Sequence, residues 1–109
     1  MRTLKSRREF ERAFKQGRRC NHPLIRMVVC DADDEGDPGR VAFVAAKRLG
    51  NAVVRNRSKR VLRVAAQACG LPIAGFHIIL FATPRTRDAK PDDMAAALDS
   101  LLRRARLDG

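Results

Sequence analysis

The residues FHIILFA, at positions 76–82, constrain the fold more than any other stretch of this 109-residue chain. A strand with one solvated face alternates apolar and polar residues, whereas this run is almost entirely apolar. It therefore predicts a central β-strand that is covered on both faces. A chain of this length buries one hydrophobic core but not two, so we expect a single domain spanning residues 1–109.

Two further segments have the composition of β-strands. Residues 23–30, PLIRMVVC, and residues 40–47, RVAFVAAK, are rich in β-branched and apolar side chains. The turn-rich acidic segment between them, DADDEGDPG, predicts that they form a hairpin with a long connection. A short additional strand is expected near residues 18–20.

Helices are predicted near both ends of the chain. Ser6 and Glu9 have the spacing of a capping box and Gly17 is a natural stop, so a first helix is expected over residues 6–17. A last helix is expected to begin near Pro91, with aspartates in its first turn and arginines in its last. With a further helix over residues 54–69, the element order is αβββαβα. This order predicts an α+β protein, a single two-layer α–β sandwich.

The segment KRLGNAVVRNRSKRVLR, residues 47–63, contains seven Lys or Arg and no acidic residue. Projected at about 100° per residue, its cations fall on one side of a helix and its small and apolar residues on the other. The polar side consists of Arg55, Asn56, Arg57, Lys59, Arg60 and Arg63. Asn51 is the expected N-cap of this helix and Gly70 its expected C-cap.

The cationic side of this helix predicts an anionic partner. Solvated helix faces usually mix Glu with Lys, because like charges four residues apart repel each other. Here Arg55, Lys59 and Arg63 form a ladder without a counter-charge, in a chain whose formal net charge is +11. Arginine can bind two phosphate oxygens at once, which favours nucleic acid. A membrane surface fits less well, because the apolar side is rich in Ala, Ser and Cys and has few of the large Trp, Phe or Leu side chains that interfacial helices insert.

The chain has no Asp or Glu from Pro38 to Arg87, a run of fifty residues. Metal-dependent phosphodiester cleavage needs carboxylates to hold its ions, so we predict neither a metal site nor a catalytic residue on the basic surface. Residues 31–36 resemble the start of a calcium-binding loop, but Ala42 replaces the required Glu. Three cysteines without CxxC spacing indicate a reducing compartment. With no secretory signal and no spanning apolar stretch, a cytoplasmic protein is expected.

From its residues alone, the chain is predicted to be a nucleic-acid-binding domain without catalytic groups. A second candidate surface is the groove between the first helix and the sheet, where an exposed Phe10 or Phe14 would stack on unpaired bases. Core packing accounts for both phenylalanines equally well. A ribosomal or assembly protein that recognises structured RNA stays open as an alternative. So does a DNA-binding protein, although flanking strands do not suit a helix-turn-helix.

The segment AAKRLGNAVVRNRSKRVLR closely resembles the signature of the bacterial ribonuclease P protein subunit. The residues that match are Lys47, Arg48, Gly50 to Val53, Arg55 to Arg57, Lys59, Arg60 and Arg63. LKSRREFERAFKQG is similar to the first helix of that family, and FHIILFATP to the strand and proline before its last helix. The resemblance covers nearly the whole chain.

This resemblance implies a fold and a function. The fold would be ribosomal protein S5 domain 2-like, with a left-handed βαβ crossover where general rules favour a right-handed one. The protein would be one subunit of an endoribonuclease that removes the 5′ leader of precursor tRNA. The catalytic groups and most of the bound Mg²⁺ would belong to an RNA subunit. The implied partners are that RNA and precursor tRNA, with no DNA or membrane.

The resemblance also assigns residues to two surfaces. Those expected to bind the RNA subunit are Arg48, Asn51, Arg55, Asn56, Arg57, Lys59, Arg60 and Arg63. Those expected to line or border a groove for the leader are Phe10, Phe14, Met27 and Lys47. Met27 stands where this family often has an aromatic residue on the second strand.

Overall fold

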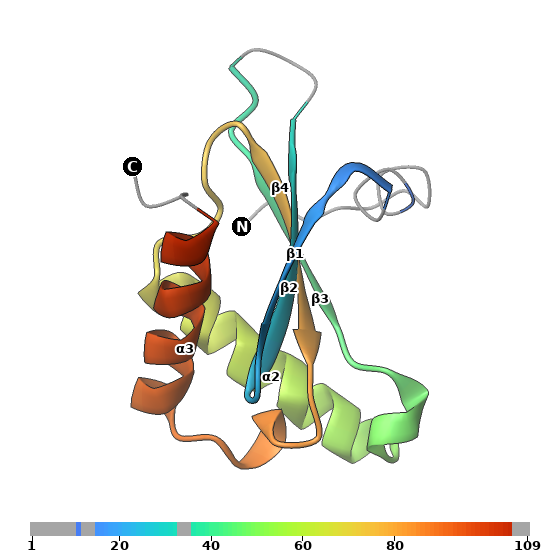
Figure 1. The fold of residues 1–109 in the computed structure, drawn as a ribbon. Helices are drawn as coiled ribbons and strands as arrows, with labels where there is room; N and C mark the ends of the chain where they lie inside the picture. The colour runs from blue at the N-terminus through green and yellow to red at the C-terminus, as the bar shows by residue number, and fades with distance from the viewer. Residues whose placement is uncertain (1–10, 12–14, 33–35, 106–109) are drawn as a thin grey trace.

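The computed structural model describes residues 11, 15–32 and 36–105. Strands β1 (Arg18–His22), β2 (Ile25–Asp31), β3 (Arg40–Val44) and β4 (Phe76–Ala82) form one sheet. Helices α2 (Ala52–Ala68) and α3 (Pro91–Arg104) pack together on one face of it (Figure 1). Two 3-10 helices, η1 (Lys47–Leu49) and η2 (Thr86–Asp88), precede α2 and α3. The fold is the predicted α+β architecture, although most of the predicted first helix lies outside the described residues.

The order of strands in the sheet is β1-β2-β4-β3. β4 is the internal strand predicted for residues 76–82, antiparallel to β2 and parallel to β3. The predicted hairpin between residues 23–30 and 40–47 is wrong, because β4 lies between β2 and β3. The most apolar strand takes the position with a neighbour on each edge, and the long connection after β2 does not hold β3 beside it. The left-handed sense of the crossover from β3 through α2 to β4 stays a prediction.

β4 is apolar except for His77 because it contributes to two clusters. The larger cluster lies between the sheet and the two helices. Its buried members include Ile25, Met27, Val29, Val41, Leu62, Ile78, Leu80, Met94, Leu98 and Leu101. A smaller cluster on the opposite face consists of Val28, Cys30, Ala42 and Ile79. Alternate residues of β2 and β4 therefore serve opposite faces, as the geometry of a strand requires.

Both ends of α2 follow from the sequence. The Asn51 side-chain oxygen accepts a hydrogen bond from the Val54 N–H at 3.0 Å, which confirms the predicted N-cap. At the other end the chain turns at Gly70, whose φ is 77°. There the N–H groups of Gly70 and Leu71 donate to the carbonyls of Gln67 and Ala66 in a Schellman motif. Gly70 thus ends the helix as predicted, one residue after the capping position. Among the described residues, no helix is both long and apolar enough to cross a membrane.

Candidate nucleic-acid interface

Helix α2 exposes most of the cations that the sequence placed on its polar side. Its buried residues are Ser58, Leu62, Ala65 and Ala66, which face the sheet, α3 and η2. Of the residues predicted for its polar side, Asn56, Arg57, Arg60 and Arg63 are exposed. Arg55 and Lys59 are half-buried, so the most open cations of α2 are the three arginines at 57, 60 and 63.

The predicted division of α2 into two separate sides is only partly correct. Ala66 is fully buried, although it projects between Arg55 and Lys59. Conversely, Val53 and Val64 lie on the exposed side. The helix packs against α3 and η2 as well as the sheet, so its buried side is wider than expected. Arg55 and Lys59 border that side, and the Arg55 Nε is buried without a hydrogen-bond partner.

The backbone of η2 holds Arg57 in place. The Arg57 Nε donates a hydrogen bond to the carbonyl oxygen of Arg87 at 3.1 Å. This contact uses one of the five guanidinium N–H donors, and the other four are on the terminal nitrogens. Because the side chain is already positioned, it would lose less conformational entropy on binding an anion through those donors.

Two threonine hydroxyls fix η2 itself. The Thr86 Oγ1 is fully buried, donates to the Leu24 carbonyl at 2.7 Å and accepts from the Thr83 N–H at 2.8 Å. The Thr83 Oγ1 donates to the Pro23 carbonyl at 2.8 Å. These bonds join the β1–β2 turn to the chain that follows β4. Together with the Arg57 contact, they connect that turn to α2.

The cationic side extends beyond the middle of α2. The Arg63 guanidinium carbon lies 5.5 Å from the centre of the Phe43 ring on edge strand β3, within range of a cation–π interaction. At the other end of α2, Lys47 and Arg48 are exposed on η1 just before Asn51. η1, α2 and the edge of β3 therefore present one basic surface, without a carboxylate in their sequences.

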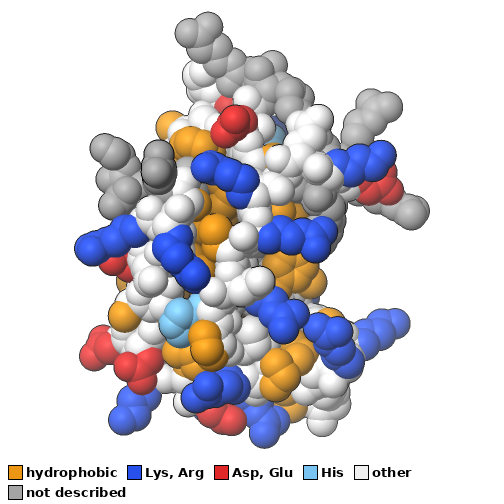
Figure 2. All heavy atoms as spheres, viewed as in Figure 1, with side chains coloured by type: hydrophobic (Ala, Val, Ile, Leu, Met, Phe, Trp, Pro, Cys, Tyr) orange, Lys and Arg blue, Asp and Glu red, His pale blue; other side chains and the backbone are white. Residues whose placement is uncertain are grey.

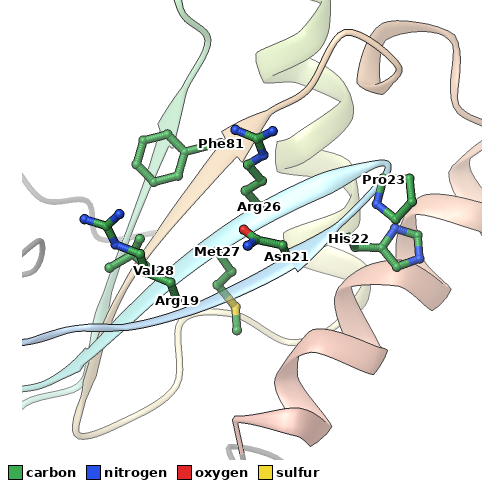
Figure 3. Close-up of a pocket in the computed structure, with 8 residues that line it drawn as sticks. All are labelled: Arg19, Asn21, His22, Pro23, Arg26, Met27, Val28 and Phe81. Carbon is green, nitrogen blue, oxygen red and sulfur yellow. The ribbon is translucent and has the colours of Figure 1, made fainter.

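A second surface lies on the sheet face opposite α2 and α3. It contains a hollow of about 670 Å³ (Figure 3). The residues that line it are Arg19, Asn21, His22, Pro23, Arg26, Met27, Val28 and Phe81. Arg26 and Phe81 are paired across β2 and β4 and project on the same side of the sheet (Figure 3). In the space-filling view, Lys and Arg side chains are spread over the visible face with hydrophobic surface between them (Figure 2).

Residues 1–106 match the ribonuclease P family. The ribonuclease P protein component of Gluconacetobacter diazotrophicus is 34% identical and aligns with 97% of this chain and 92% of its own length. The chain belongs to the ribonuclease P family. The component from Symbiobacterium thermophilum is 35% identical, over 95% of this chain and 90% of its own. The Staphylococcus aureus RNase P protein superposes with a TM-score of 0.82 at 24% identity, covering 100% of this chain and 99% of that one, and so has the same fold.

In this member of the ribonuclease P family, the structure describes two of the predicted groove residues, Met27 and Lys47. Met27 borders the hollow, but its side chain is 1% exposed and belongs to the core beneath α2 and α3. It points away from Arg26 and Phe81 (Figure 3). Lys47 is exposed on η1, and Phe10 and Phe14 lie outside the described residues.

The hollow contains residues that sequence reasoning missed. They are Arg19, Asn21, Arg26 and Phe81. The alternation of side chains along β2 could have indicated Arg26. If Met27 faces the core, its neighbours Arg26 and Val28 must face the opposite side of the sheet. The resemblance indicated a position on the strand without saying which face this chain presents there.

The two histidines are too far apart to act together on one phosphodiester. His22 pairs with Ile25, which pairs with Ala82 at the end of β4, whereas His77 lies near the start of β4. Five residues of strand separate these levels, which is about 17 Å. Within the part of the chain that the structure describes, no three His, Cys, Asp or Glu side chains are close enough to hold a metal ion.

In the part of the chain that the structure describes, Asp37 and Cys69 have shifted pKa values, and both lie outside the basic surface. The Gly39 N–H, 2.8 Å from the Asp37 carboxylate, holds the pKa of that carboxyl below its ordinary value of 3.8, with smaller contributions from His77 and Arg40. Burial raises the pKa of the Cys69 thiol, whose sulfur donates to the Ala95 carbonyl at 3.5 Å. A thiol that stays protonated is a poor nucleophile, so Cys69 is a packing residue.

Proposed function

We propose that this protein is the protein subunit of a ribonuclease P ribonucleoprotein. In this proposal it binds the catalytic RNA subunit and the 5′ leader of precursor tRNA, and assists the endonucleolytic cut that gives the mature tRNA 5′ end. The observation that carries the proposal is the basic, carboxylate-free side of α2 in a chain that belongs to the ribonuclease P family.

The basic side of α2, extended by η1, would bind the RNA subunit. Its arginines neutralise phosphates, and the Arg87 carbonyl holds Arg57 ready for one. Each phosphate contact releases counterions, so binding weakens as salt rises. If about five cations meet phosphates, a plot of log affinity against log salt should have a slope of roughly −4.

The open face of the sheet would bind the single-stranded leader. Arg26 is exposed there for a phosphate, and Asn21 offers both a donor and an acceptor to a base edge. Phe81 supplies an aromatic surface in the same hollow, and unpaired bases stack on such surfaces. Phe10, Phe14 and Lys47 remain predicted contributors at the border of this groove.

The chemistry of cleavage would belong to the RNA subunit and to the Mg²⁺ that the RNA holds. The protein contributes position and positive charge, and its cations take over part of the phosphate neutralisation that Mg²⁺ otherwise supplies. The protein should therefore matter most when Mg²⁺ is scarce.

Reconstitution tests this proposal. Purified protein is mixed with a bacterial ribonuclease P RNA and precursor tRNA, at a Mg²⁺ concentration where the RNA alone is slow. We expect faster cleavage at the mature 5′ end, and competition by precursor tRNA but not by duplex DNA. No gain over the RNA alone would reject the proposal. It would leave a ribosomal or assembly protein that recognises structured RNA.

A further inference from the structure

The exposed side of α2 carries apolar side chains as well as cations. Among the described residues, the large hydrophobic side chains that stay exposed are Val53, at 75%, and Val64, at 48%. They are eleven residues apart, which is three helical turns plus about 20°, so they lie along one line of the helix. Arg57 and Arg60 lie between them on that line, four and seven residues after Val53. The outermost line of α2 is therefore Val, Arg, Arg, Val.

This arrangement is not explained by folding or by phosphate binding. Neither valine belongs to either core cluster. β-branched residues are also poorer helix formers than the Lys or Arg that a surface built only for phosphates would use. Single exposed apolar residues are common, but these two flank two of the three exposed arginines, Arg57 and Arg60.

We infer that Val53 and Val64 contact the ribose and base surface of the ribonuclease P RNA, on either side of the phosphates that Arg57 and Arg60 bind. This inference rests on the proposed function. RNA presents sugar and base surface between its phosphates, and the shallow minor groove of A-form RNA exposes such surface to a helix. The outer line of α2 likewise places apolar side chains next to cations, so each could meet its counterpart on the RNA.

The charge of this side of α2 favours RNA over a second copy of the chain or a membrane. A second copy of this chain, packed symmetrically through α2, would bring the same cations and no carboxylate to the same place. A membrane would have to accept two valines about 16 Å apart with arginines between them, which is not an insertable face. RNA matches both the charge and the spacing of the apolar groups.

The two kinds of contact respond differently to salt. Phosphate contacts weaken as salt rises because counterions are released on binding, whereas burial of a valine against a sugar or base does not depend on counterions. The valines should therefore add a component of affinity that persists at high salt. The arginines should determine the slope of log affinity against log salt.

The test compares V53A/V64A with R57A/R60A. Kd for a bacterial ribonuclease P RNA is measured by filter binding at several KCl concentrations and constant Mg²⁺. The valine pair should raise Kd about tenfold at every salt concentration, since each Val→Ala removes part of the apolar area buried on binding. Its log–log line should run parallel to that of the wild type. The arginine pair should instead flatten the slope by somewhat less than two.

Three controls keep the test specific. V53T/V64T retains the branched shape but replaces a methyl with a hydroxyl, and it should also weaken binding. R103A, on the exposed side of α3, should leave Kd nearly unchanged. Thermal unfolding should show little loss of stability for the valine variants, because both side chains are exposed.

The outcomes separate the inference from the proposed function. If the wild type neither binds the RNA nor stimulates cleavage, both are wrong. If the wild type binds the RNA and the Kd of V53A/V64A equals that of the wild type at every salt concentration, only the valine contact is wrong. A changed slope in V53A/V64A would also overturn it, because the valines would then act through the arginines. So would sedimentation showing that the valine substitutions dissolve a dimer.

Discussion

Asn51 links the stability of α2 to its proposed role in RNA binding. Its side-chain oxygen caps the Val54 N–H, one of the backbone donors left unpaired at the start of the helix. Asn51→Ala should lower the free energy of unfolding by about 1 kcal/mol. Urea denaturation followed by circular dichroism measures this loss. An unchanged midpoint and slope would contradict the capping role.

Asn51→Asp separates capping from RNA contact. Aspartate also caps well, and its negative charge suits a helix N-terminus, so stability should return to the wild-type value. If the RNA affinity of Asn51→Asp is below that of the wild type although stability is restored, the RNA requires the amide or its lack of charge. If affinity recovers with stability, Asn51 acts only as a cap.

Asp37, at the end of the sheet that carries the acidic connection, should make the stability of the protein depend on pH. Its carboxyl has a lowered pKa in the folded protein, chiefly because it accepts the Gly39 N–H, so folding favours the charged form. Its contribution is present above the unfolded pKa and is lost as pH falls through the folded value. Asp37→Ala should therefore be less stable than the wild type at neutral pH, and the gap should close below about pH 4.

Urea denaturation at several pH values measures that gap. Asp37→Asn keeps an acceptor for Gly39 and removes the charge, so it should lose less stability than Asp37→Ala at neutral pH. A gap that stays constant between neutral and acidic pH would show that the ionised form contributes nothing.

The positions of Met27 and Arg26 show where sequence reasoning is weakest at the residue scale. They are neighbours on β2, but one is buried beneath the helices and the other is exposed in the hollow. A shift of one residue moves a side chain to the other face of a strand. The resemblance placed Met27 near the leader groove, and only the pairing of β2 with β4 shows which side it takes.

At the scale of elements, the hydrogen bonds of Thr83 and Thr86 should keep η2 in the position where its Arg87 carbonyl accepts from Arg57 of α2. Thr86→Val keeps the shape of the side chain but leaves the Leu24 carbonyl and the Thr83 N–H without their partner. A buried unpaired polar group costs about 1–3 kcal/mol, so the free energy of unfolding should fall by about 2 kcal/mol or more. Thr86→Ser keeps the hydroxyl and should lose much less.

A double-mutant cycle tests the connection from η2 to Arg57. In the Thr86→Val background, Arg57→Ala should reduce RNA affinity by a smaller factor than it does in the wild type, because η2 no longer holds Arg57. Equal factors in the two backgrounds would show that the position of Arg57 is independent of Thr86.

The elements themselves were largely predictable, but their pairing was not. Residues 76–82 form β4 as predicted, and Asn51, Gly70 and Pro91 mark helix ends as predicted. These features depend on local patterns of apolar residues and on backbone capping. Whether β3 lies beside β2 or β4 depends on contacts between distant residues, and a hairpin was the wrong choice. Likewise, contact with α3 and η2 widened the buried side of α2.

At the scale of the whole molecule, the acidic connection between β2 and β3 and the start of the basic helix α2 lie at opposite ends of the sheet. Asp31 and Asp37 lie where β2 ends and β3 and β4 begin, while η1, η2 and the start of α2 lie at the other end (Figure 1). The acidic connection is thus kept away from the start of α2, where the proposed RNA subunit would bind. The sequence predicted the charge of each segment, and the topology separates them in space.

This separation leads to a prediction about catalysis. If the RNA subunit supplies the catalytic groups, no single carboxylate of the protein is essential for the chemical step. Each of the twelve acidic residues is replaced by Ala in turn, and cleavage is measured in single-turnover reactions with saturating protein. We expect rates within a few-fold of the wild type, because loss of a metal-holding or proton-transferring group typically costs at least a hundredfold. The described aspartates are Asp31, Asp37, Asp88, Asp92, Asp93 and Asp99. A variant that still binds precursor tRNA and the RNA subunit but cannot cleave would identify a catalytic group in the protein, and would shift part of the chemistry from the RNA to this chain.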